Sequence, residues 1–114
     1  MNYRGENMHT LTLTQLAGIS EDEMKCLDDV IERLVQERNA AKIFDIVREY
    51  VNKRIMFLAD KMYDKYLKET VMRLFTERFM ILTFVTNREI EIHVFKKTTA
   101  TGGVRVLKEV LPRK

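Results

Sequence analysis

Apolar positions after Ser20 follow a helical period and fall into two separate stripes. The first stripe is formed by Met24, Leu27, Ile31, Leu34 and Val35. The second is formed by Ile43, Phe44, Val47, Tyr50 and Val51. Leu34 and Val47 are 13 positions apart, and at about 100° per residue they lie on nearly opposite sides of one straight helix. The pattern therefore predicts two helices, with a turn near Asn39 that folds them into an antiparallel hairpin.

The first helix has a clear start in the stretch ISEDEM. Ser20 is the expected N-cap, and Glu23 completes a capping box with it. Ile19 and Met24 occupy the positions of a hydrophobic staple. Because acidic side chains are favoured at the positive end of a helix dipole, the acidic run beginning at Glu21 needs no ligand to explain it.

The helical pattern continues from Ala41 to about Arg78, with Ile55, Leu58, Ala59, Met62 and Tyr66 on one side. An unbroken helix of this length would measure roughly 55 Å, which is too long for a compact monomer of this size. Either the helix breaks near residues 68–70 or a second subunit covers the overhang. We favour a homodimer, whose interface would include Leu58, Met62 and Tyr66.

Strand patterns begin after Phe79. The segment FMILTFV is β-branched and aromatic, IEIHVF and VRVLKEVL alternate in polarity, and Pro112 closes the last run. These segments predict a three-stranded antiparallel meander over residues 79–111. TLTLT, residues 10–14, also alternates and could add an edge strand to an N-terminal arm over residues 1–19.

The expected architecture is therefore one α+β domain over residues 1–114, with helices over residues 20–78 and a sheet over residues 79–111. A length of 114 residues suits a single domain with its own core. Apolar residues make up 46% and charged residues 32% of the chain, which is typical of a globular domain. No apolar run approaches the roughly 20 residues that span a bilayer. No secretory signal is evident either, so we expect a cytoplasmic protein without a membrane partner.

Charge is unevenly distributed along the chain. Residues 1–37 carry eight acids and three bases, whereas residues 38–114 carry nine acids and seventeen bases. Such asymmetry fits an anionic partner for the second part. It fits equally well a homo-oligomer in which an acidic helix meets a neighbour's basic helix.

Two groups of basic residues are candidates for binding nucleic acid. Arg54, Lys61, Lys65 and Lys68 would form a ridge on the second helix. Pairs of Asp64 with Lys68 and of Lys65 with Glu69 would partly neutralise this ridge. The second group, Lys96, Lys97 and Arg105, lies at the base of the hairpin KKTTATGG. Its glycines follow the lysines and lead into a strand, so the segment is a hairpin turn and not a P-loop.

Residues that could carry catalysis or bind a metal do not form a recognisable motif. His9 and His93 have no cysteine or carboxylate at metal-ligand spacing. Cys26 lies among acidic residues, which disfavour its thiolate. Asp28 and Asp29 point about 100° apart on a helix, so they are not an acid–base pair. We therefore expect a non-enzymatic protein with no cofactor and no metal.

Two functions remain. The first is a small regulatory protein that forms a homodimer and binds another protein, in which Met56, Met62 and Met72 suit adaptable contacts. The second is sequence-independent binding of nucleic acid by the ridge and the hairpin. No motif of a known family is present. The size and composition are typical of regulatory and accessory proteins, including those of phages and viruses.

Overall fold

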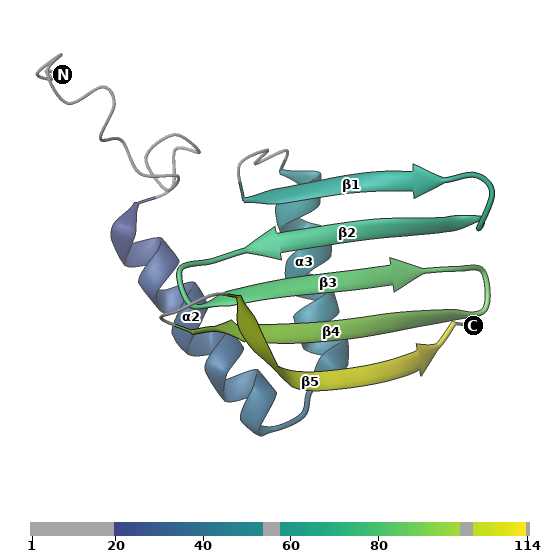
Figure 1. The fold of residues 1–114 in the computed structure, drawn as a ribbon. Coiled ribbons are helices and arrows are strands. Elements are labelled where there is room, and N and C mark those ends of the chain that lie inside the picture. Colours follow the sequence, from purple (N-terminus) through teal and green to yellow (C-terminus); the bar gives the residue numbers. More distant parts are fainter. Residues whose placement is uncertain (1–19, 54–57, 99–101, 114) are drawn as a thin grey trace, which may run out of the picture.

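The protein is an α+β domain in which two helices precede a five-stranded antiparallel sheet. The computed structural model describes residues 20–53, 58–98 and 102–113. The strands lie side by side in chain order, from β1 to β5. Both helices lie behind the sheet in the view of Figure 1, so they cover one of its two faces. The predicted edge strand TLTLT lies outside the described residues.

Helix α2 (Glu21–Gln36) begins as the sequence predicts. The Ser20 side chain accepts a hydrogen bond from the Glu23 backbone N–H at 3.1 Å, and the Glu23 side chain completes the capping box. Ile19, the other predicted staple residue, lies outside the described residues. The buried stripe of α2 contains Met24, Leu27, Ile31 and Leu34, which confirms the predicted face.

The turn predicted near Asn39 is confirmed, and it uses two residues in different ways. Arg38 takes the left-handed conformation with φ 53°, and Asn39 is the N-cap of helix α3 (Ala40–Asn52). The Asn39 side chain accepts a hydrogen bond from the Lys42 backbone N–H at 3.2 Å. Helix α3 then runs back behind the sheet (Figure 1) and buries Ala40, Ile43, Phe44 and Val47.

The predicted long helix is wrong beyond Asn52. Residues in that range form strands β1 (Ala59–Asp64) and β2 (Glu69–Phe75), so the sheet has five strands and not three. Strand β2 carries apolar side chains on both faces, and this hides the alternation that identifies a strand. Apolar residues then recur at intervals of three and four by coincidence, as they do in a helix.

The turn between β1 and β2 contains no glycine, proline or asparagine, which is why the sequence did not reveal it. Asp64 accepts hydrogen bonds from the backbone N–H groups of Tyr66 at 2.9 Å and Leu67 at 3.1 Å. Lys68 then takes the left-handed conformation with φ 53°. Asp64 therefore shapes a turn and is not the helical ion-pair partner of Lys68 that the sequence predicts.

The other strands of the sheet are β3 (Phe79–Val85), β4 (Glu89–Lys97) and β5 (Gly103–Pro112), which confirm the predicted meander. One cross-strand row in the covered face joins Ala59, Leu74, Ile81, Val94 and Leu107. These five side chains are at most 3% exposed and form the core with the helices. Within the described residues, no helix has both the length and the apolar character needed to cross a membrane.

The acidic helix α2 pairs with basic residues of its own chain. Arg78, in the β2–β3 turn, lies 2.7 Å from Asp29 and 3.6 Å from Glu32, and it also approaches Asp28. Lys96 lies 3.3 Å from the same Glu32 oxygen. These ion pairs join the turn to the helix. They also neutralise part of the acidic charge of α2 with basic residues of the same chain.

Candidate interaction surface on the open face of the sheet

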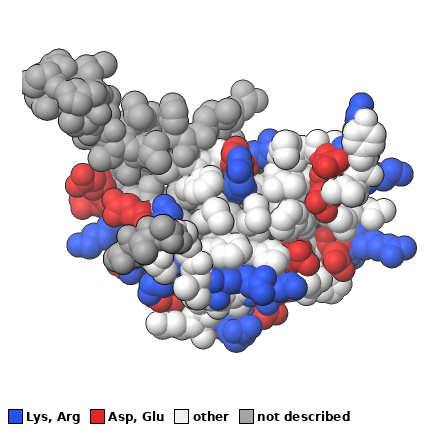
Figure 2. All heavy atoms as spheres, in the orientation of Figure 1, with Lys and Arg blue, Asp and Glu red and all other residues white. Residues whose placement is uncertain are grey.

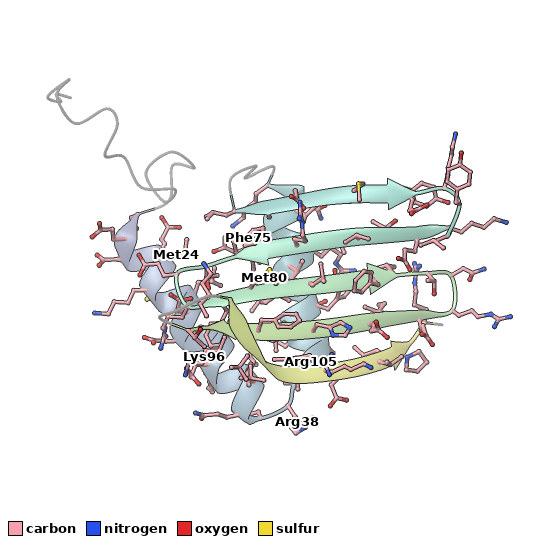
Figure 3. All side chains as sticks on the ribbon, viewed as in Figure 1. Met24, Arg38, Phe75, Met80, Lys96 and Arg105 are labelled. Atoms are coloured by element: carbon pink, nitrogen blue, oxygen red, sulfur yellow. The ribbon has the colours of Figure 1, made fainter. Side chains whose placement is uncertain are left out.

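The face of the sheet turned away from the helices carries a continuous set of apolar side chains. Figure 3 views this open face, with Phe75, Met80 and Arg105 labelled on it. Its central residues come from three adjacent strands and are half-buried. We call them the apolar patch: Val71, Phe75, Met80, Leu82, Phe84 and Phe95. Met62 on β1 extends it at one edge, with 65% of its surface exposed. Val110 on β5, 45% exposed, lies on the same face beyond Glu91.

Strand β3 is apolar on both faces. Phe79 and Ile81 point into the core and are fully buried, whereas Met80, Leu82 and Phe84 point to the open face. A strand with a continuous apolar run is typical of a sheet covered on both sides, and an antiparallel sheet with one solvated face alternates instead. In the part of the chain that the structure describes, only one side is covered. The run FMILTFV thus belongs to a sheet whose second face is not covered by any described segment.

His93 lies among the aromatic rings of the open face. Its ring is edge-on to Phe84, with centroids 5.8 Å apart, and stacked with Phe95 at 6.3 Å. His93 Nε2 lies 2.9 Å from a Glu91 carboxylate oxygen, and the Arg105 guanidinium lies 3.5 Å from Nδ1. An Arg105 N–H can only donate, so Nδ1 is the acceptor of this contact. The proton of the neutral ring is then on Nε2, and this N–H donates a hydrogen bond to the Glu91 carboxylate. The hydrogen bond from His93 is the main reason that the pKa of Glu91 is lowered.

A β-bulge brings Arg105 to this face. The register between β4 and β5 shifts at Val94 and Phe95, so Phe95 lies opposite Arg105 while Val94 lies opposite Leu107. Without the extra residue, alternation would place Arg105 on the covered face. The bulge therefore adds a cation to the β5 edge of the open face.

Charges of both signs border the apolar patch. The Arg73 guanidinium donates two hydrogen bonds to the Asp60 carboxylate, at 2.9 Å and 2.5 Å. Glu91, Arg105 and Lys108 lie along the other side. Figure 2 shows this face with white side chains over the central strands and blue and red ones around them. The open face is thus apolar at its centre and of mixed charge at its rim.

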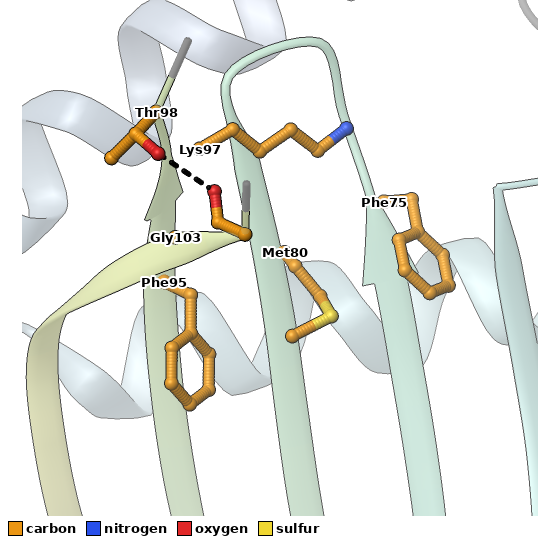
Figure 4. A pocket seen from close by; sticks show the side chains of 7 residues that line it. Phe75, Met80, Phe95, Lys97, Thr98 and Gly103 are labelled. Carbon is orange, nitrogen blue, oxygen red and sulfur yellow. Dashed lines mark hydrogen bonds between the residues drawn. The ribbon is translucent and has the colours of Figure 1, made fainter. Parts of the chain in front are cut away.

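A hollow of about 370 Å³ indents one end of the apolar patch, beside the β4–β5 hairpin (Figure 4). Its apolar walls are Phe75, Met80 and Phe95. Gly103 forms part of the rim, and a Cβ added there would lie 2.8 Å from the Lys96 carbonyl oxygen. The second glycine of KKTTATGG is thus needed because two backbones approach closely, and the predicted hairpin turn is confirmed.

The predicted basic residues do not form a helical ridge, because their segment is a strand and a turn. Arg54 lies outside the described residues. Lys61 is on β1, Lys65 and Lys68 are in the following turn, and all three are exposed. At the hairpin, Lys96 pairs with Glu32 behind the sheet, the Lys97 ammonium donates a hydrogen bond to the Thr76 carbonyl oxygen, and Arg105 lies on the open face. The six described residues therefore do not share one surface.

The residues predicted for a helical dimer interface are also separated. Leu58 is 2% exposed and belongs to the core of its own chain. Met62 lies at the edge of the open face, and Tyr66 is in the β1–β2 turn, 87% exposed. The predicted common helical face does not exist, since α3 ends at Asn52.

Groups with catalytic or metal-binding potential are sparse in the described part of the chain. No cluster of three or more His, Cys, Asp or Glu side chains there is arranged to hold a metal ion. Cys26 is exposed on α2. The His93 ring contacts Glu91 and Arg105. The arrangement is suited to positioning side chains on a contact surface.

Fold and surface together define the class: a two-layer α+β protein whose sheet has one open, largely apolar face. The chain matches no protein-family model, no curated protein and no solved structure. The open-face residues Phe75, Phe84 and Phe95 were not identified from the sequence. For Phe84, the signal that could have identified it is the largely apolar run FMILTFV, which predicts two covered faces. Phe75 and Phe95 lie outside this run, on β2 and β4.

Proposed function

We propose that this is a non-enzymatic interaction protein that acts as a homodimer, and that the two copies join through the open faces of their sheets. The observation that carries the proposal is the apolar character of both faces of β3, of which the helices cover only one. Contiguous exposed apolar surface with a polar rim is typical of protein–protein contacts.

The size of the open face supports a second copy as its occupant. Five strands spaced about 4.8 Å apart and about 24 Å long outline roughly 600 Å², and protruding side chains increase the accessible area. A stable interface removes about 800 Å² of surface from each partner. Face-to-face packing of two such sheets would form a sandwich with strands inclined by about 30°.

The mixed charge of the rim also supports self-association. In a two-fold symmetric dimer the same surface of each copy meets itself, so it must carry both signs of charge. Asp60 and Glu91 supply negative charge, and Arg73, Arg105 and Lys108 supply positive charge. A face with one sign of charge would instead favour a different, oppositely charged partner.

A regulatory role follows as part of this proposal. With the sheets occupied by each other, the exposed helix surfaces and hairpin ends of a dimer would be presented twice to a further protein. This partner is identified only as a protein that contacts two copies of the same surface, and two-fold presentation would raise its apparent affinity.

Sedimentation velocity at micromolar concentrations tests the homodimer. The parent chain should sediment as a dimer, and Leu82→Lys should sediment as a folded monomer because it places a charge at the centre of the apolar patch. Val104→Lys is the matched control: it introduces the same charge at an apolar strand residue outside the patch, which is 58% exposed, and should remain dimeric. A parent chain that is monomeric throughout this range would contradict the proposal.

A further inference from the structure

A second feature lies at the opposite end of the sheet from the β4–β5 hairpin. Because the strands are antiparallel and in chain order, the β1–β2 turn, the β3–β4 turn and the end of β5 meet there. These three segments form the right-hand end of the sheet in Figure 1. Figure 2 shows several blue side chains projecting from this end, with red ones between them.

The segments line an open hollow of about 700 Å³. This volume lies within the range of about 300–1,000 Å³ that is usual for ligand sites. Its charged residues are Lys68, Arg88, Glu89 and Arg113, and we call this hollow the basic end. Side chains of Tyr63, Thr70 and Asn87 also line it.

The three cations of the basic end have no carboxylate within ion-pair distance among the described residues. Elsewhere in the molecule most of the described arginines are paired, including Arg38, Arg73 and Arg78. Glu89 is the one acid that lines the hollow, so its charged residues carry a net positive charge.

Backbone contacts hold two of these segments in place. The Arg113 backbone N–H donates to the Arg88 carbonyl oxygen at 2.9 Å, and the Arg113 guanidinium donates to the Thr86 carbonyl oxygen at 2.7 Å. The Arg88 backbone N–H donates to the Thr86 hydroxyl at 3.2 Å. One guanidinium is therefore already oriented, which lowers the entropy cost of binding an anion.

An aromatic ring completes the site. Tyr63 lines the hollow from β1 and is 60% exposed, so its ring is accessible. Exposed aromatic rings beside cations are the usual arrangement for binding a nucleotide, in which the base stacks on the ring and the phosphate lies on the basic groups.

We propose that the basic end binds a nucleotide unit, either free or within a single strand, with its phosphate on Lys68, Arg88 and Arg113 and its base on Tyr63. The site is at the end of the sheet and not on the open face, so it does not depend on the homodimer. The hypothesis of nucleic-acid binding thus applies to a different surface: of the six described basic residues predicted from the sequence, only Lys68 lines this hollow.

Fluorescence anisotropy with a labelled oligothymidylate of about ten nucleotides tests the proposal. The parent chain should bind, and its affinity should fall as the salt concentration rises. Each phosphate contact on a single strand contributes about 0.7 to the slope of log affinity against log salt. Arg88→Gln with Lys68→Gln should reduce that slope by about 1.4 and weaken binding at least tenfold. The side chains of Lys68 and Arg88 make no hydrogen bond or ion pair with described residues, so the fold should survive.

The matched control removes the same charge from the helices. Lys25→Gln with Lys42→Gln changes two exposed lysines and should leave the slope almost unchanged. Equal weakening by the two double variants would overturn the proposal, because net charge alone would then explain binding. Absence of binding by the parent in low salt would overturn it as well.

A third comparison tests the aromatic contact. Tyr63→Ala should weaken binding at least fivefold without changing the salt slope, since stacking involves no counterion release, and Tyr63→Phe should retain binding. Unlabelled thymidine monophosphate distinguishes the two sources of the ligand. If thymidine monophosphate displaces the labelled strand, the site binds a free nucleotide. If the strand binds and thymidine monophosphate does not displace it, the ligand is a nucleic-acid strand. Equal affinity of the parent and Tyr63→Ala would contradict the proposed stacking of the base on Tyr63.

Discussion

Gly103 stands at the start of β5, where two backbones come too close for a side chain. An added Cβ would lie 2.8 Å from the Lys96 carbonyl oxygen, and backbone atoms cannot move aside as a flexible side chain can. We expect Gly103→Ala to lower the free energy of unfolding by about 1–3 kcal/mol. Urea denaturation measures this, and Val104→Ala at the next, exposed position should change it little. A Gly103→Ala protein as stable as the parent would contradict the close approach.

Glu91 should give the fold a measurable pH dependence. Its hydrogen bond from His93, assisted by the charges of Lys108 and Arg105, lowers its pKa from the ordinary value of 4.5. A carboxylate with a lowered folded-state pKa stabilises the fold above its unfolded pKa, and the contribution is lost as pH falls through the folded value. Glu91→Gln should therefore lose less stability than the parent as pH falls below 4.5.

Urea midpoints measured across the acid range test this dependence. Glu77→Gln, at an exposed glutamate in the β2–β3 turn, should retain the parent's pH dependence. If Glu91→Gln loses stability on acidification as steeply as the parent, the hydrogen bond with His93 does not contribute in solution.

At the scale of elements, the β1–β2 turn contains a residue in a conformation that its side chain disfavours. Lys68 takes φ 53° there, and a left-handed conformation costs a residue with a Cβ about 1–2 kcal/mol. Glycine avoids this cost, so Lys68→Gly should raise the free energy of unfolding by about 0.5–1 kcal/mol despite the greater freedom of its unfolded chain. Leu67→Gly, at a neighbouring position without positive φ, should lower it. Urea denaturation distinguishes the two variants. A Lys68→Gly protein less stable than the parent would contradict the left-handed conformation of Lys68.

At the scale of the whole molecule, the proposed homodimer links stability to concentration. If folded copies associate and unfolded ones do not, dilution lowers the free energy of unfolding. The decrease is up to about 1.4 kcal per mole of dimer for each tenfold dilution. The midpoint of thermal unfolding of the parent should therefore rise with protein concentration. The midpoint of Leu82→Lys should not. A parent midpoint independent of concentration would count against the dimer.

The sequence by itself determined the local features whose signals lie within a few residues. The capping box at Ser20, the turn near Asn39 and the three strands after Phe79 were all predicted, because each depends on backbone groups, residue types or alternation close along the chain. It also predicted that the glycines of KKTTATGG make a hairpin turn.

Only the tertiary structure decided where the chain between Lys53 and Thr76 belongs. Pairing of β1 with β2, and of β2 with β3, supplies hydrogen bonds and neighbours that override a helical spacing of apolar residues. That pairing disperses the predicted basic ridge and places Lys68 beside Arg88 and Arg113, which are distant in the sequence. It also collects Phe75, Phe84 and Phe95 on one face. Such surfaces depend on strand order and register, and the residues of a single segment do not encode either one.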